Sequence, residues 1–157
     1  MYWQPVAGGR LPAASTLRHT KMMGHDEHPV LLFDGVCNLC NAFIRFIIRH
    51  DPKHHFRFAS LQSRFGGETL QRFHLPIEKY GSAILLENGK IYTRSTAALR
   101  VIRKLNGGWS LLYAFIILPP FLRDAAYNLI ARKRYHWFGK KEECMVPAAE
   151  LVELFIE

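Results

Sequence analysis

Apolar residues recur along this chain with two different periods, and each change of period marks a predicted element. Val30–Phe33 is a short, wholly apolar run, which is typical of a central strand in a sheet. Asn38–Arg49 then carries apolar residues at helical spacing, and Asp51-Pro52 should end this helix. The predicted apolar face comprises Leu39, Ala42, Phe43, Phe46 and Ile47, and the polar face comprises Asn41, Arg45 and Arg49.

A second strand and a second helix follow at once. Phe56–Ala59 alternates between apolar and polar positions, which predicts a strand. Ser63–His74 predicts a helix, and the glycine pair near its start weakens its helical propensity. Pro76 should close this part of the chain.

A hairpin and a third helix come next. Ser82–Leu86 predicts a strand, and Asn88-Gly89 favours a two-residue type I′ turn, so Lys90–Thr93 should pair back antiparallel. Ser95 or Thr96 should then cap a helix that stops at the following pair of glycines.

The order of these elements predicts the fold. The first two strands should pair in parallel, because the helix between them makes a right-handed crossover. The hairpin should add an antiparallel pair. We therefore expect an α/β fold with a mixed four-stranded sheet and flanking helices. This is the arrangement of thioredoxin. The core should span residues 29–106.

Two regions lie outside that core. Residues 1–28 lack sustained periodicity and a secretory apolar segment, so we expect a disordered N-terminal extension. Residues 107–157 should form a helical C-terminal extension packed on the same domain. Within it, the apolar run Trp109–Leu122 is too short to span a membrane and should pack on the core. One further helix should dock through the apolar stripe Phe121, Leu122, Ala125, Ala126, Leu129 and Ile130.

The net charge of +8 changes this picture little. Much of it lies in Arg132–Arg134 and Lys140-Lys141, which we interpret as a solvated helix end whose cations complement the helix dipole. No nucleic-acid-binding motif accompanies the charge, so we expect no nucleic-acid partner. Contact with an anionic membrane surface is the minority interpretation.

The candidate chemistry lies in Cys37-Asn38-Leu39-Cys40, between the first predicted strand and helix. A cysteine at a helix N-terminus is favoured as a thiolate by the unpaired N–H groups and the helix dipole. A second cysteine three residues later lies one turn away on the same face, where a disulfide can form. The context favours redox chemistry over a half zinc site, because no second CxxC pair is present. A buried structural pair of cysteines is the third alternative.

Cys144 is the third cysteine, and the sequence leaves three roles open for it. It could pack in the core, act as a third redox thiol, or join Cys37, Cys40 and His136 around zinc. We rank packing first and metal last. We expect no metal and no cofactor. Three cysteines are too few for a disulfide-stapled secreted scaffold, so we expect a reducing, cytoplasmic location.

The chain resembles the DCC family, thioredoxin-like proteins named for an Asp and two Cys. The resemblance rests on Phe33–Cys40, on Arg94–Leu99, and on Arg134–Gly139 followed by Cys144. It covers roughly residues 30–147 and implies a predicted thiol-disulfide oxidoreductase. Ordinary thioredoxins place a cis-proline before the third strand. The corresponding stretch here, Lys79–Ala83, has none, so substrate capture should differ.

These patterns assign roles to the site residues. Cys37 is the candidate nucleophile, and Cys40 the resolving thiol, expected to be less exposed. Asp34 could relay a proton to Cys40 or simply form a turn with Gly35, which should supply backbone freedom. Around this site, Ser95 is interpreted mainly as a helix cap and Arg94 as a solvated cation that could meet an anionic group.

Two functions remain from the sequence. The first is a dithiol-disulfide oxidoreductase whose substrate is a disulfide-containing protein or a small-molecule thiol, with an unknown upstream reductant. The alternative is a non-catalytic thioredoxin-like module that docks on a protein partner or a membrane surface through Trp109–Leu122.

Overall fold

A computed structural model of the chain describes residues 28–76, 83–142 and 149–156. Three expectations lie outside these ranges: the disordered N-terminal extension, the role of Cys144, and most of the stretch that lacks the thioredoxin proline. Within the described ranges, no helix is both long and apolar enough to cross a membrane.

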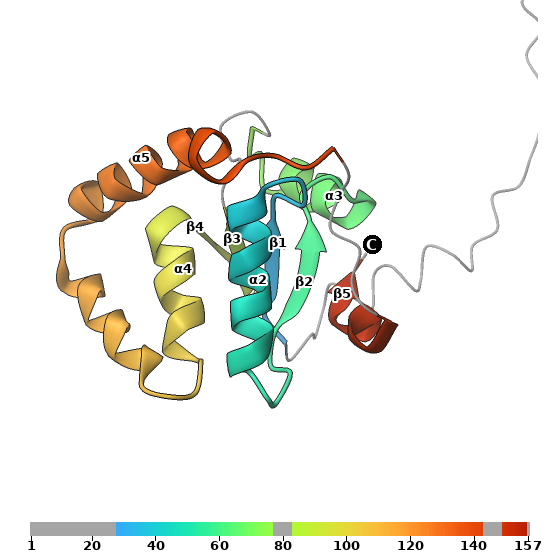
Figure 1. Ribbon diagram of the computed structural model, residues 1–157, viewed down its shortest axis with the longest axis horizontal. Coiled ribbons are helices and arrows are strands. Elements are labelled where there is room, and N and C mark those ends of the chain that lie inside the picture. The colour runs from blue at the N-terminus through green and yellow to red at the C-terminus, as the bar shows by residue number, and fades with distance from the viewer. Residues whose placement is uncertain (1–27, 77–82, 143–148, 157) are drawn as a thin grey trace, which may run out of the picture.

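The centre of the fold is a mixed five-stranded sheet with the order β4-β3-β1-β2-β5 (Figure 1). β1 (Val30–Phe33) pairs in parallel with β2 (Arg57–Ser60) and antiparallel with β3 (Ile84–Glu87). β3 also pairs antiparallel with β4 (Lys90–Thr93) across the predicted Asn88-Gly89 turn. The four predicted strands and the thioredoxin-like α/β class are therefore confirmed.

The fifth strand was not predicted. β5 (Phe155–Ile156) follows the 3₁₀ helix η3 (Ala149–Leu154) and pairs in parallel with β2 at the edge of the sheet. Two residues are too few to show a strand period, so no pattern in the sequence marks this element. Phe155 contacts the ring of Phe58, and this packing places the strand.

Both faces of the sheet are buried, and alternate residues of β1 serve opposite faces. Leu31 and Phe33 pack under α2 (Asn38–His50) and α4 (Arg94–Arg103), which cover one face (Figure 1). Val30 and Leu32 pack on the other face with Leu70 of α3 (Arg64–Arg72). The wholly apolar sequence of β1 follows from this two-sided burial.

α2 confirms the predicted first helix, with two corrections to its faces. Ala42 was expected inside and is exposed, whereas Asn41 was expected outside and is buried. Asn41 is held inside because its side-chain amide donates to the carbonyl oxygen of Gly35, 3.0 Å away. The apolar positions that are fully buried on this helix are Ile44 and Ile47.

α4 corrects the expected cap. The helix begins at Arg94, and the N-cap position is Thr93, so neither Ser95 nor Thr96 is the cap. Ser95 is buried instead, and its hydroxyl donates to the carboxylate of Asp124 at 2.5 Å. A contact across helices has replaced the local capping bond that the sequence suggested.

The C-terminal extension differs most from expectation. After α4 come a 3₁₀ helix, η2 (Trp109–Ile117), and α5 (Pro120–Phe138), which crosses α4 and approaches the start of α2 (Figure 1). The apolar stripe predicted to dock is exposed: Phe121 is 76% and Leu129 is 55% accessible. α5 turns Tyr127, Ala131 and Arg134 inward instead.

Candidate active site

Cys37 is the N-cap residue of α2 and is fully buried, with no accessible surface. Its sulfur accepts a hydrogen bond from the backbone N–H of Cys40 at 3.4 Å. This contact and the positive end of the helix dipole both favour a negative charge on the sulfur. The predicted helix-start placement of the first cysteine is thus present.

Cys40 lies one turn further along α2 and is partly accessible. Burial raises the pKa of its thiol to about 12, and the hydrogen bond with Cys37 adds to this rise. Both cysteines are free thiols. The expectation that Cys40 would be the less exposed thiol is wrong, because the segment after α5 covers Cys37 and leaves Cys40 partly open.

That cover consists of Phe138, the last residue of α5, and the segment 139–141 that follows it. The backbone of Lys140 forms an antiparallel bridge with Cys37, and the N–H of Lys141 donates to the carbonyl oxygen of Val36 at 2.8 Å. The side-chain amide of Asn38 donates to the carbonyl oxygen of Phe138 at 2.9 Å. The cover therefore occupies the backbone groups around the first cysteine.

Gly139 allows the cover to lie this close. Its φ is +79°, which is unfavourable for a residue with a side chain, and an added Cβ would lie only 3.1 Å from the amide nitrogen of Asn38. A glycine is thus required both for the turn after α5 and for the approach to α2.

Asp34 lies beside the thiols and is 3% exposed. One carboxylate oxygen accepts from the guanidinium of Arg134 at 2.8 Å and from the hydroxyl of Tyr135. The other accepts from the side-chain amide of Gln62 at 2.9 Å and from the N–H of Val36 at 3.2 Å. Every one of these partners donates, so the carboxylate acts as an acceptor in each of these hydrogen bonds.

Arg134 connects this carboxylate to the second thiol. A second nitrogen of its guanidinium lies 3.7 Å from the sulfur of Cys40, and its side chain is 6% exposed. The cation acts to lower the pKa of Cys40 against the larger effect of burial, while Asp34 acts to raise it. For Tyr135, burial followed by the bond to Asp34 raises the phenol pKa to about 12, so it stays a donor.

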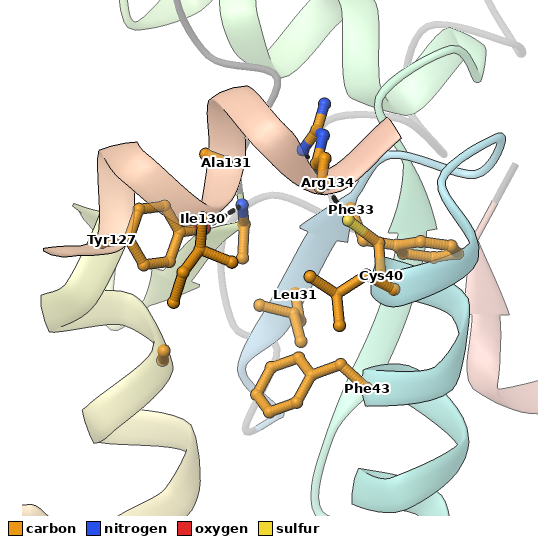
Figure 2. Close-up of a pocket in the computed structure, with 11 residues that line it drawn as sticks. Leu31, Phe33, Cys40, Phe43, Tyr127, Ile130, Ala131 and Arg134 are labelled. Atoms are coloured by element: carbon orange, nitrogen blue, oxygen red, sulfur yellow. Dashed lines mark hydrogen bonds between the residues drawn. The ribbon is translucent and has the colours of Figure 1, made fainter. Parts of the chain in front are cut away.

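A partly open cavity of about 220 Å³ lies between β1, α2, α4 and α5 (Figure 2). Cys40 and Arg134 form part of its wall, and the remaining wall is nearly all carbon. Cys37 does not line it. The lining residues are Leu31, Phe33, Leu39, Cys40, Phe43, Ala83, Ala98, Tyr127, Ile130, Ala131 and Arg134.

The structure brings together Asp34, Gly35, Cys37 and Cys40, as the sequence predicted. Gly35 contributes its backbone, because its N–H donates to the side chain of Gln62 at 3.2 Å and its carbonyl accepts from Asn41.

Ser95 and Arg94 form a separate cluster with Asp124, in which the guanidinium lies 3.9 Å from the carboxylate. The anionic group that Arg94 meets therefore comes from the protein itself.

Three residues of the site were not singled out from the sequence. Gln62 and Tyr135 bind Asp34 directly, and Arg134 contacts both Asp34 and Cys40. The signal for the last two was the stretch Arg134–Gly139, which carries part of the family resemblance, although the charge of Arg134 itself was interpreted as part of a solvated helix end. Among the described residues, no group of three or more histidine, cysteine or acidic side chains could hold a metal ion.

The fold and the site define a thioredoxin-like protein with two thiols at the start of its first long helix. Residues 31–140 match the family model described as DCC1-like thiol-disulfide oxidoreductase. The match spans more than half of the chain, and the protein belongs to this family.

Two relatives support the assignment. The uncharacterized protein YuxK of Bacillus subtilis (strain 168) is 47% identical over 127 residues, which cover 81% of this chain and 93% of that protein. The DCC family protein At1g52590, chloroplastic, of Arabidopsis thaliana is 37% identical over 120 residues, which cover 76% of this chain and 70% of that protein. No solved structure matches the chain.

Proposed function

We propose that the protein is a thiol-disulfide oxidoreductase in which Cys37 and Cys40 alternate between a dithiol and a disulfide. The observation that carries this proposal is the contact between the two thiols at the start of α2, where Cys37 accepts the N–H of Cys40. Membership of a family described by this activity supports the same reaction class.

Within the pair, we propose Cys37 as the sulfur that reacts as a thiolate. The helix dipole and the N–H donor favour its charge, whereas burial keeps Cys40 protonated at neutral pH. In a thiol-disulfide exchange a thiol of raised pKa is a poor leaving group, and Cys40 is that thiol here. The Cys37–Cys40 disulfide should therefore open so that Cys37 departs as the thiolate.

The test is a redox titration of the pair. The protein is equilibrated in dithiothreitol buffers of graded potential, free thiols are trapped by alkylation, and peptides are weighed by mass spectrometry. We expect one two-electron transition that converts both thiols together. Cys144→Ser is the matched control and should leave that transition in place.

Thiols that never pair in any buffer would refute the proposal. The Cys37→Ser and Cys40→Ser variants should each lose the transition and the turnover of a disulfide substrate supplied with a reductant. Activity that survived in the double variant would also contradict the assignment.

A second candidate function is docking on an anionic membrane surface, and it rests on a different observation. Large apolar side chains around η2 are strongly exposed, with Leu111 at 79%, Ile117 at 85% and Phe121 at 76%. Contiguous apolar surface of this kind marks interaction sites. The net charge of +8 favours an anionic bilayer as the partner.

Liposome flotation tests this candidate. Vesicles with phosphatidylglycerol should retain the protein, and phosphatidylcholine vesicles should retain less. Ile117→Asp should reduce retention, while Cys37→Ser/Cys40→Ser should leave it unchanged. Equal retention of Ile117→Asp and the parent protein would exclude docking through η2. Neither the substrate nor a cytoplasmic location follows from these observations, and both stay predictions.

A further inference from the structure

The two thiols have different surroundings. Cys40 lines the cavity, whereas Cys37 lies under the cover formed by residues 138–141. The sulfur of Cys40 faces α5 at the cavity wall, between Phe33 and Arg134 (Figure 2). Cys37 has no accessible surface, and Lys140 lies across its backbone. A molecule that enters the cavity therefore meets the second cysteine and not the first.

The polar groups of the cavity wall are either hydrogen-bonded or shielded from a bound molecule. The hydroxyl of Tyr127 accepts the N–H of Ala83 at 3.1 Å, and two nitrogens of the Arg134 guanidinium contact Asp34, Tyr135 and the sulfur of Cys40. The third nitrogen, Nε of Arg134, makes no hydrogen bond to the described residues, but it is buried and offers no accessible surface to a bound molecule. A bound molecule would find carbon and sulfur around it. An occupant without hydrogen-bonding groups is favoured, because a polar one would lose its hydrogen bonds to water without replacement.

The volume sets the size of the occupant. An apolar cavity of roughly 150 Å³ holds benzene, and this one measures about 220 Å³. A chain of a few methylenes, or one small ring, fits this space. A polypeptide cannot add as a strand beside Cys37, because Lys140 and Lys141 already occupy that edge. These facts favour a small molecule over a protein substrate.

We propose that the cavity binds the apolar body of a small disulfide and that the mixed disulfide forms on Cys40. This inference rests on the proposed function and deepens it by naming the substrate class. It also changes the roles expected from the sequence, in which Cys37 attacked the substrate first. Here Cys37 acts on the mixed disulfide from inside.

The steps balance as two exchanges. Cys40 first loses its proton to water and reacts through the small ionised fraction of its thiol. This thiolate attacks a disulfide RS–SR, a Cys40–S–S–R bond forms, and one RS⁻ leaves and takes up a proton from water. The Cys37 thiolate then attacks the sulfur of Cys40, the bond to the substrate sulfur breaks, and a second RS⁻ leaves and takes a proton from water to become RSH. The substrate is reduced to two thiols, the pair becomes a disulfide, and a dithiol such as dithiothreitol restores it.

A homologous series of dialkyl disulfides tests the site. The Cys37→Ser protein is treated with dimethyl, diethyl, dipropyl and dibutyl disulfide, and the modified cysteine is found by peptide mapping. Each methylene that leaves water favours binding by a factor of about four. The rate of adduct formation on Cys40 should rise by about that factor per added methylene, and the same protein in urea should show no such rise.

Cavity filling supplies a matched pair of variants on α5. Ala131 lines the cavity, whereas Ala126 is exposed on the same helix. Ala131→Phe should abolish the dependence on chain length, and Ala126→Phe should keep it. If Ala131→Phe fails to fold, toluene replaces it as a probe: a saturating amount should slow the reaction of Cys40 with dibutyl disulfide.

The outcomes separate this inference from the proposed function. A rate without dependence on chain length, or one that toluene leaves unchanged, overturns the cavity proposal even if the redox titration succeeds. A stable adduct on Cys37 in the Cys40→Ser protein, formed faster than the adduct on Cys40, also overturns it. The rate of adduct formation on Cys40 could depend on chain length in a protein whose two thiols never form a disulfide. That result would support binding in the cavity and refute the proposed oxidoreductase activity.

Discussion

The segment from Trp109 to Phe138 exposes large apolar side chains at its start and buries a charged side chain near its end. In η2 and the first turn of α5, large apolar side chains face solvent, as Ile117 and Phe121 show. Towards the end of α5, the guanidinium of Arg134 is buried against Asp34. Stability alone would favour the reverse arrangement. Burial of apolar area therefore explains neither part of this segment. The first part keeps an apolar surface open to solvent, and the second part completes a charged site beside the thiols.

The largest effect should follow from removing the buried cation. Arg134→Met removes the cation that pairs with the buried carboxylate of Asp34. Breaking a buried ion pair in this way costs about 3–5 kcal/mol. Urea unfolding should show this loss in the free energy of unfolding, and Arg132→Met, at an exposed position on the same helix, should change it by less than about 0.5 kcal/mol. Equal stability of the two variants would show that the ion pair does not hold α5.

The reactivity of Cys40 should reflect its surroundings nearly as strongly. With a pKa of about 12, the thiol is protonated across the neutral range, and its thiolate fraction rises tenfold per pH unit below that value. Alkylation of Cys40 by iodoacetamide in the unmodified protein, followed by peptide mapping, should therefore increase by about a thousandfold between pH 7 and 10. A plateau below pH 9 would show that Arg134 outweighs burial.

A smaller effect is expected at the phenol that completes the cluster. Tyr135→Phe removes one donor to Asp34 while Arg134, Gln62 and Val36 remain. The free energy of unfolding should fall by about 1–2 kcal/mol, less than for Arg134→Met. Chemical denaturation of both variants checks the order. A Tyr135→Phe loss as large as that of Arg134→Met would contradict the view that the cation is the main partner.

The smallest effect should come from the first, apolar part of the segment. Phe121→Ser removes a side chain that is 76% exposed, so the free energy of unfolding should change by no more than about 0.5 kcal/mol. Leu85→Ala, at a fully buried position of β3, is the contrast and should lose about 2–5 kcal/mol. A large loss in Phe121→Ser would mean that this exposed part is covered in the folded protein in solution.

The sequence predicted the core because its residues obey simple periods. Leu31 and Phe33 on one face and Val30 and Leu32 on the other make β1 apolar throughout, and that run is readable without a structure. The two thiols and Asp34 were equally readable, because a strand, a turn and a helix start place them locally.

The rest depends on contacts between distant segments. The residues next to Asn41 in the sequence do not show that its amide will bind the carbonyl of Gly35. The residues next to Arg134 do not show that it will pair with the carboxylate of Asp34. The apolar stripe of α5 has helical spacing, and spacing alone does not say which side of a helix meets the core. The cover over Cys37 was missed for the same reason, since its backbone contacts leave no pattern in the side chains.

The contact between Asp34 and Arg134 joins residues 100 positions apart in the sequence. Closing so long a loop costs entropy that local elements do not repay until α5 has docked, so this contact should form late in folding. During synthesis on the ribosome, the turn that carries both thiols emerges long before the arginine that neutralises its carboxylate. A nascent chain therefore holds reactive cysteines without the finished site around them. The complete site therefore exists only in a protein in which nearly the whole fold has formed.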